Sequence, residues 1–357
     1  MSWLRLIRSR RVGVATFWRL LADHGSARAA LIALPELARA AGVTDYEPCP
    51  ESVALAEIRA AGRAGARMIC KGDADYPDML AGIPDAPPLF WARGDRSFLG
   101  RPMVALVGAR NASSLGTRMA RKLAGDLSAA GMTIVSGLAR GVDAAAHLAA
   151  LEGGTVAVLA GGVDVIYPAE NLGLADQIAA KGLLLSEQPI GLAAQARHFP
   201  LRNRIIAGLA RAVVVVEAAA QSGSLITAKL ALDQGRDVLA VPGHPFDARA
   251  SGCNMLIRDG AALVRGAEDV LAALTLPLAA KTATSPPSPA PAPAPRGWKD
   301  QAALHSLILN RLGPSPLAED QLLRDLALAP SDAAPELLAL ELEGKILRAP
   351  GGLLSRP

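Results

Sequence analysis

The chain has 357 residues, a length that predicts two or three domains. Hydrophobic residues make up 51% and charged residues 20%, yet no uninterrupted apolar run reaches the roughly 18 residues of a membrane-spanning helix. No export signal is recognisable at the N-terminus, so a cytoplasmic location is expected. Cys49, Cys70 and Cys253 are far apart and form no CxxC pair, which favours reduced, buried thiols over a metal or redox site.

The net charge of +4 and the pI near 9.1 suggest a nucleic-acid partner, but the charge is spread evenly. Basic against acidic residues number 11 and 8 over residues 1–75, 18 and 17 over residues 76–275, and 8 and 8 over residues 276–357. Any DNA site must therefore be a local cluster of basic residues and not a strongly basic domain.

Residues 1–72 are Ala-rich with a helical period and predict a small N-terminal helical domain. Over residues 103–265, short β-branched runs alternate with Gly-rich turns and helical patterns, as in VALVGAR, TIVSGLARG, TVAVLAGG and AVVVVEA. Near-continuous apolar strands between helices indicate a parallel sheet covered on both faces. The fold class is therefore α/β, with an extended Rossmann-like parallel sheet domain over residues 73–275.

Residues 276–298 alternate Pro and Ala and predict a linker, after which residues 299–357 form a tail domain. Two helical patterns are followed by a third helix that opens at Ser331 as N-cap and ends near Gly344. A hairpin turning at residues 351–352 completes a predicted C-terminal winged-helix domain. The third helix is acidic (Asp332, Glu336, Glu341, Glu343), which favours contact with protein over contact with DNA and leaves both open.

In such a sheet, ligands bind beyond the carboxyl ends of the strands, where Gly-rich turns lead into helices. The first turn, residues 108–111, contains Arg110, a bidentate phosphate donor, and precedes a helix whose first N–H groups can hold an anion. The second turn is residues 136–141, and the third is residues 221–224. All three predict close approach of the backbone to a ligand.

The tightest basic cluster is HFPLRNR, residues 198–204, which places arginines beside an aromatic ring. Phosphate donors next to a stacking surface are what a single strand requires. Phe199 could equally be a core residue. Arg202 and Arg204 are two apart on a helix, so we expect one to contact ligand and the other to pair with a carboxylate.

Two further polar residues have structural readings. His147 is expected to be a helix residue with a structural hydrogen bond, although a site role remains open. Asp143 is expected to cap a helix.

Enzyme alternatives lack their motifs. The sequence has no GxGxxG followed by an acidic residue, no GxxxxGK[ST], no GxSxG and no HExxH. Residues 242–245 resemble a loop of the nucleoside-monophosphate glycosidases that reads PGGxGTxxE, but its glycines and glutamate are missing here. A Rossmann-fold nucleotide-binding enzyme is kept as the alternative to a non-enzymatic DNA binder.

Over residues 76–265 the chain closely resembles the DNA-processing protein A (DprA, also called Smf) family. The resemblance is carried by YPDML, PPLFWARG, VALVGAR, IVSGLARGVDAAAH, VAVLAGGVDVIYPAEN, LLSEQP, FPLRNRIIAGLA, SGSLITAKLAL, AVPG and SGCNMLIRDGA. The N-terminal segment resembles that family's sterile-alpha-motif-like or helix-hairpin-helix-like head. The tail resembles the winged-helix module of some members.

The resemblance implies a single-stranded DNA-binding recombination mediator that protects incoming DNA in natural transformation and loads the recombinase RecA. It also implies a homodimer formed through the Rossmann-like domain. From the missing motifs, the cysteine spacing and the lack of a long apolar run, we expect no catalytic residue, cofactor, metal site or membrane contact. The ssDNA-binding residues expected from the turns and the resemblance together are Gly108, Arg110, Ser136, Gly137, Arg197, Phe199, Arg202, Asn203, Arg204, Ser222, Gly223 and Ser224, with Arg197 only a substitute for a family lysine.

Overall fold

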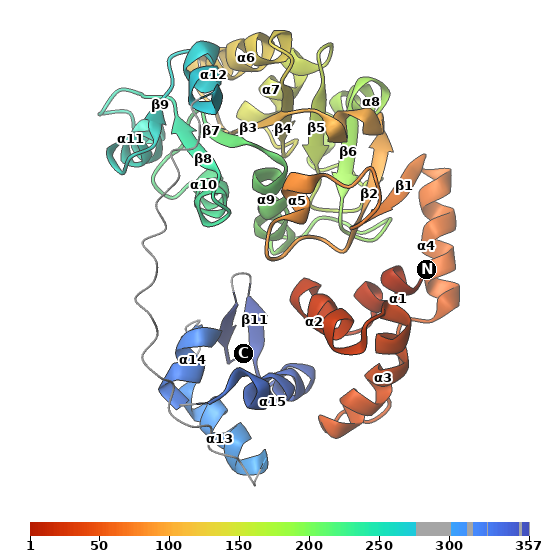
Figure 1. Cartoon of the computed structure of the whole chain (residues 1–357). Helices are drawn as coiled ribbons and strands as arrows, with labels where there is room; N and C mark the ends of the chain where they lie inside the picture. Colours follow the sequence, from red (N-terminus) through yellow and green to blue (C-terminus); the bar gives the residue numbers. More distant parts are fainter. Residues whose placement is uncertain (276–300, 313–316, 327, 350–351, 357) are drawn as a thin grey trace. The chain divides into compact units, whose positions relative to one another are not determined.

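The computed structural model describes the whole chain except residues 276–300, 313–316, 327, 350–351 and 357 (Figure 1). The predicted linker, residues 276–298, lies outside the described residues. Contacts divide the chain into two compact units, Met1–Leu55 with Ala280–Pro357, and Ala56–Ala279. The four domain ranges expected from the sequence stay a prediction, since the first unit draws on both ends of the chain.

The unit of residues 56–279 is built on one sheet with strand order β1-β2-β6-β5-β4-β3-β7-β8-β9. From β6 to β9 all neighbours pair in parallel, whereas β1 and β2 are antiparallel additions at one edge. The strands are β1 (Ala66–Cys70), β2 (Leu89–Gly94), β3 (Met103–Val107), β4 (Thr133–Ser136), β5 (Thr155–Val158), β6 (Leu183–Ser186), β7 (Ala212–Val215), β8 (Asp237–Ala240) and β9 (Ala262–Leu263).

Helices cover both faces of this sheet (Figure 1). Alternate residues of β3 face opposite layers: Val104 and Leu106 pack with α6, α7 and α12, and Ala105 and Val107 with α9 and α10. The predicted α/β class is confirmed. The helices are α4 (Glu51–Arg63), α5 (Asp78–Ala81), α6 (Ser114–Ala129), α7 (Val142–Ala150), α8 (Leu172–Lys181), α9 (His198–Leu209), α10 (Ser224–Asp233), α11 (Ser251–Arg258) and α12 (Ala267–Thr275), with short 3-10 turns at Arg96–Gly100, Ala169–Asn171 and Ala248–Ala250.

The strand order reverses beside β3. The chain passes from β3 to β4 on one side and later returns to β7 on the other. At such a switch point the connections leave in opposite directions, which opens a crevice beyond the carboxyl ends of the strands. The turns after β3, β4 and β5 meet there.

The N-terminal part of the other unit contains three short helices, α1 (Ser2–Arg8), α2 (Val14–His24) and α3 (Ala27–Ala40). Their amphipathic faces meet around Phe17, Leu20 and Leu34, which are fully buried. Ser26 begins α3 by accepting a hydrogen bond from the N–H of Ala29 at 3.2 Å.

The C-terminal part is the predicted winged-helix domain. Its elements are α13 (Gln301–Arg311), β10 (Leu317–Ala318), α14 (Glu319–Leu326), α15 (Pro330–Leu342), β11 (Leu347–Ala349) and β12 (Leu353–Ser355), with sheet order β10-β12-β11. Helix α15 begins at Pro330 with Ala329 as its N-cap, so the N-cap expected at Ser331 is wrong. Proline suits a first helical position because its φ is already helical and its missing N–H would be unpaired there.

Helix α15 packs against the N-terminal helices within this unit. Leu338 and Leu342 are buried in the same apolar cluster as Phe17 and Leu20. A carboxylate oxygen of Glu341 lies 3.1 Å from the Arg19 guanidinium. The acidic third helix therefore contacts protein in this structure, as its charge favours.

In the part of the chain that the structure describes, no helix is long and apolar enough to cross a membrane. The three cysteines form no disulfide: Cys49 and Cys253 are buried as expected, but Cys70 is only half-buried because it lies on the outer strand β1.

Candidate nucleic-acid interface

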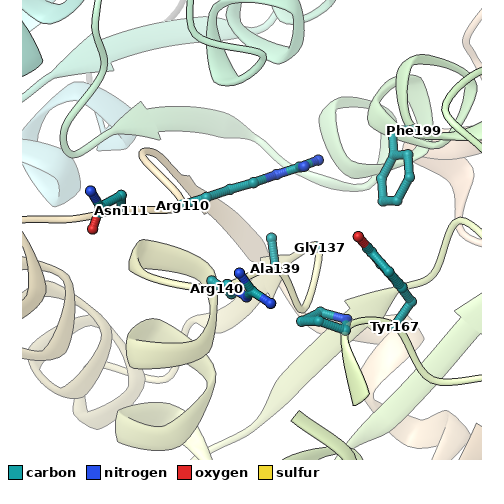
Figure 2. A pocket seen from close by; sticks show the side chains of 8 residues that line it. Arg110, Asn111, Gly137, Ala139, Arg140, Tyr167 and Phe199 are labelled. Atoms are coloured by element: carbon teal, nitrogen blue, oxygen red, sulfur yellow. The ribbon is translucent and has the colours of Figure 1, made fainter. Parts of the chain in front are cut away.

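A pocket of about 240 Å³ opens at the switch point of the sheet (Figure 2). Its residues come from the turns after three neighbouring parallel strands and from the first turn of α9. The lining is Arg110 and Asn111 after β3, Gly137, Ala139 and Arg140 after β4, Tyr167 and Pro168 after β5, and Phe199 on α9.

Two aromatic rings and one guanidinium group form the mouth of the pocket. The Arg110 guanidinium lies 5.1 Å from the centre of the Phe199 ring, a cation–π distance. Tyr167 meets Phe199 edge-to-face, with ring centres 5.7 Å apart. Figure 2 shows Arg110 extended toward Phe199 and the Tyr167 hydroxyl pointing into the same space. Phe199 therefore lines the pocket instead of joining the core.

A second cation stands on the β4 side of the pocket. Arg140 is exposed and its Nε lies 2.8 Å from Glu170, a pair in which both side chains are more than half exposed. Such a pair is weak in water, so a phosphate could displace the carboxylate. Asn171 donates to the carbonyl of Leu138 at 2.9 Å and ties this turn to the one after β5.

The floor of the pocket is Gly137, with Arg202 directly behind it. A Cβ built at Gly137 would lie 2.0 Å from Nη1 of Arg202, so only glycine fits. Arg202 is buried and donates to the carbonyl of Val158. Burial lowers the pKa of Arg202 to about 10, which leaves it charged at neutral pH. Its role here is to place positive charge beneath the pocket, without contact at the surface.

The carboxylate that acts electrostatically on Arg202 is Asp143. Burial raises the pKa of this carboxyl, and the nearby Arg202 opposes that shift. Asp143 accepts from the N–H groups of Gly137 at 3.1 Å and Ala139 at 3.3 Å. It therefore holds the turn that precedes α7 and does not cap the helix, whose N-cap is Gly141.

A carboxylate of the chain itself lies at the start of α6, where the sequence predicted a site for an anion. Glu217, just after β7, accepts from the N–H of Ser113 at 2.9 Å and from the Ser113 hydroxyl. Gly116 is so close that a Cβ would lie 2.3 Å from the Glu217 carboxylate. This helix end therefore holds an internal anion, and Arg110 is the phosphate donor that the turn offers.

Arg204 differs from its predicted role. Its guanidinium is 2% exposed and is bonded to Glu187 and to the carbonyl of Asp85. Because its donors are used inside the protein, the expected ligand contact is replaced by a structural ion pair. Arg204 therefore pairs with a carboxylate, as expected of one of the two arginines, but Arg202 is buried as well, and neither lines the pocket.

The remaining predicted residues fall into three groups. Gly108 and Ser136 support the turns: a Cβ at Gly108 would lie 2.6 Å from Val142, and the Ser136 hydroxyl donates to Leu106 at 2.6 Å. Arg197 is exposed and Asn203 half-buried, and neither lines the pocket. The turn after β7 stands apart, with the hydroxyls of Ser222 and Ser224 hydrogen-bonded to each other at 2.7 Å and Gly223 exposed between them.

Five lining residues were missing from the predicted set: Asn111, Ala139, Arg140, Tyr167 and Pro168. Arg140 ends the Gly-rich turn SGLAR, and Tyr167 belongs to the segment that follows β5. Tyr167 could have been found by applying the carboxyl-end rule to β5 as well as to β3, β4 and β7, whereas Arg140 lies in the turn after β4 that the sequence had already indicated. His147 has the expected structural role, with Nδ1 2.6 Å from the Thr155 hydroxyl.

Three family models match the chain in order. The DprA-like N-terminal HHH domain matches residues 1–60, DNA recombination-mediator protein A matches residues 67–275, and the DprA winged helix domain matches residues 285–352. The middle model alone covers more than half of the chain. The chain belongs to the DNA recombination-mediator protein A family.

Relatives and solved structures of this family agree with that assignment. Protein Smf of Synechocystis is 40% identical over 78% of this chain and 77% of its own length, and Protein Smf of Escherichia coli is 37% identical over 78% and 74%. The structure of DNA processing protein A from Streptococcus pneumoniae superposes with a TM-score of 0.58 at 36% identity, covering 73% of this chain and 98% of that one. That of the Helicobacter pylori protein, reported for its single-stranded DNA binding mode, gives 0.54 at 28% identity, covering 58% and 95%.

Proposed function

We propose that the pocket between Arg110, Tyr167 and Phe199 binds single-stranded DNA, as the related H. pylori protein does. The observation that carries this is the Arg110 guanidinium placed over the Phe199 ring in a pocket at the switch point of the sheet. A phosphate can reach the exposed Arg110 guanidinium while a base stacks on the face of an aromatic ring of the pocket.

The geometry favours single strands over duplexes. Aromatic rings can stack only on bases that are free of their own partners, and a duplex offers them only at its ends. The exposed cations of the pocket, Arg110 and Arg140, supply few phosphate contacts. Tight binding of a long strand then requires two copies of the chain on the same strand, which raises the effective concentration of the second contact.

The finer role follows from the family. We propose that the chain protects incoming single strands during DNA uptake, acts as a cytoplasmic homodimer formed through the sheet domain, and loads RecA without itself catalysing a reaction. The ranges 1–72, 73–275, 276–298 and 299–357 are proposed as its domains and linker.

Arg110→Ala tests the phosphate contact. Binding of labelled poly-dT, followed by fluorescence anisotropy over a salt series, should lose affinity, and the slope of log K against log salt should flatten by about 0.7, the value for one phosphate on a single strand. Arg121→Ala, at an exposed arginine of α6 outside the pocket, is the matched control and should leave the slope unchanged.

Two variants test whether the aromatic ring of Phe199 stacks on a base. Phe199→Ala should weaken poly-dT binding by about 1–3 kcal/mol, the range for one stacked base, and Phe199→Trp should retain most of it. Normal affinity for both Arg110→Ala and Phe199→Ala, in folded protein, would remove the pocket from the function. Hydrolysis of nucleoside monophosphates would then be assayed, and its presence would favour the enzyme alternative.

A further inference from the structure

Phe246 is the most exposed large apolar side chain that the structure describes, at 95% relative exposure. It lies in the loop after β8, six residues beyond the end of that strand at Ala240. Among the described aromatic residues only Tyr167 and Phe246 are exposed. Both follow the carboxyl ends of parallel strands, so the two exposed rings share one edge of the sheet.

Hydrogen bonds order the loop of Phe246, although the side chain of Phe246 itself is exposed to solvent. Gly243 exchanges hydrogen bonds with the Asn254 side chain at 3.2 and 3.0 Å. The N–H of Asp247 donates to the carbonyl of His244 at 2.9 Å. Its carboxylate accepts from the N–H of Arg249 at 3.0 Å. Among the described aromatic rings, that of His244 contacts the Phe246 ring, with 5.6 Å between the ring centres. The ring is therefore presented to solvent by an ordered turn and adds little to the core.

Helix α11, which follows the loop of Phe246, is joined at its first residues to the turn after β7. The N–H of Gly252 donates to the carbonyl of Ala218 at 2.8 Å, and the N–H of Ala220 donates to the Ser251 hydroxyl at 3.0 Å. Ser222 and Ser224, with Gly223 exposed between them, belong to that turn and open α10. Hydrogen-bonded backbone therefore connects the turn of residues 222–224, called the SGS turn below, with the loop of Phe246. We call this stretch of surface between the SGS turn and Phe246 the ledge.

Glu217, at the start of the turn after β7, connects the ledge with the turn that carries Arg110. Its carbonyl accepts from the N–H of Ala109 at 2.6 Å, next to Arg110, and its carboxylate holds Ser113. Along the sheet, β7 and then β8 follow β3, and neighbouring strands lie about 4.8 Å apart. The span from β3 to β8 is therefore about 10 Å, which a few nucleotides of single strand can cross.

We propose that Phe246 is a second base-stacking site, and that a single strand held in the pocket runs over the SGS turn to reach it. The inference rests on the proposed function, because it extends the same strand along the same edge of the sheet. The SGS turn supplies hydroxyl groups and an exposed glycine for the intervening phosphate. The Phe246 ring stacks on a base as Phe199 does, and this contact is independent of which base it is.

Oligonucleotide length separates the second site from the first. Anisotropy would be measured with dT of about 2 nucleotides, which fills the pocket but is too short to reach Phe246, and of about 16 nucleotides, which spans both. Phe246→Ala should weaken binding of the long oligonucleotide by roughly 5-fold or more and leave the short one unchanged, whereas Phe199→Ala weakens both. Phe246→Trp should restore long-strand affinity.

The matched control is Leu232→Ala. Leu232 is 55% exposed and lies at the end of α10, which returns to the opposite edge of the sheet. Equal binding by Phe246→Ala and the unaltered protein at both lengths, with Phe199→Ala still weak, would overturn this inference alone. If Phe199→Ala bound both oligonucleotides as tightly as the unaltered protein, the proposed function itself would be contradicted. Sedimentation of each variant tests whether Phe246 instead contacts a second copy of the chain. If Phe246→Ala weakens DNA binding only because two copies of the chain dissociate, the ring is a self-association contact and the stacking site is refuted.

Discussion

His147 lies fully buried beneath the same turn that Asp143 and Arg202 support. Its Nδ1 pairs with the Thr155 hydroxyl, which itself donates to the carbonyl of Ile134 at 3.0 Å. That hydroxyl must accept from the imidazole, so the neutral ring carries its proton on Nδ1. Burial, with the nearby Arg202 charge, lowers the pKa of His147 to about 3.

A pH dependence of stability follows from this residue. Because the folded pKa is below the unfolded value, His147 costs no stability above about pH 6.5, and the unfolded state gains protons as pH falls from there toward 3. At pH 4.5 the free energy of unfolding should be lower by about 2–3 kcal/mol on account of this group. Urea unfolding of the full chain at both pH values would measure it.

Two histidine variants test whether His147 causes this pH dependence of stability. His147→Gln removes the titrating ring and should flatten this part of the pH profile, even if its stability at pH 7 is reduced. His244→Gln, at an exposed position of the same unit, should keep the full dependence. An unchanged profile in His147→Gln would place the proton uptake on another group.

At the scale of elements, the turns between strands and helices are held by close backbone approach. Gly141, at the start of α7, has a φ of 72°, and a Cβ there would lie 2.3 Å from the carbonyl oxygen of Ala109. The turn after β4 is thus pressed against the turn after β3 that carries Arg110. Both the left-handed backbone and the contact exclude a larger residue.

Gly141→Ala should therefore destabilise the fold more than its backbone angle alone requires. Gly131→Ala is the control, because Gly131 has a φ of 85° but open space around its Cβ, and it should cost about 1–2 kcal/mol. Gly141→Ala should exceed that cost in urea unfolding and also weaken poly-dT binding by displacing Arg110. Equal losses for the two variants would show that the close contact carries no energy.

At the scale of the whole molecule, the unit made of both chain ends is joined by a mixed apolar and ionic contact. Glu341 lies between Arg19, at 3.1 Å, and Arg348, at 3.4 Å, and accepts from the Thr16 hydroxyl at 3.2 Å. The side chains of Arg19 and Glu341 are 19% and 14% exposed. Burial lowers the pKa of Arg19, which Glu341 partly offsets.

Reversing one charge should separate this contact. Glu341→Arg places three cations together and should lower the free energy of unfolding of this unit by about 2 kcal/mol or more, and adding Arg19→Glu should recover part of the loss. Calorimetry of the full chain and hydrogen exchange over α2 and α3 would report it. Arg311→Glu, in a pair whose arginine is 56% exposed, should change stability by only about 0.5 kcal/mol or less. Failure of the double reversal to recover stability would show that the ion pair does not hold the contact.

Local pattern was enough for the class of each domain and for part of the site. Apolar runs between Gly-rich turns predicted the parallel sheet, because strands buried on both faces need apolar residues at every position. The same runs located the turns of Arg110 and Gly137, since ligand sites lie at the carboxyl ends of parallel strands. The cluster around Phe199 was found from residue type, because phosphate and base each call for a distinct side chain.

Only the tertiary structure decided which of these groups face a ligand. Glu217 accepts from an N–H group at the helix end that the sequence predicted for an anion, because a carboxylate remote in sequence reaches this position only in the folded sheet. Arg204 is likewise buried in an ion pair with Glu187. Tyr167 joins the pocket for the same reason. Sequence determines which groups the chain carries, whereas burial and long-range pairing determine which of them remain exposed to bind.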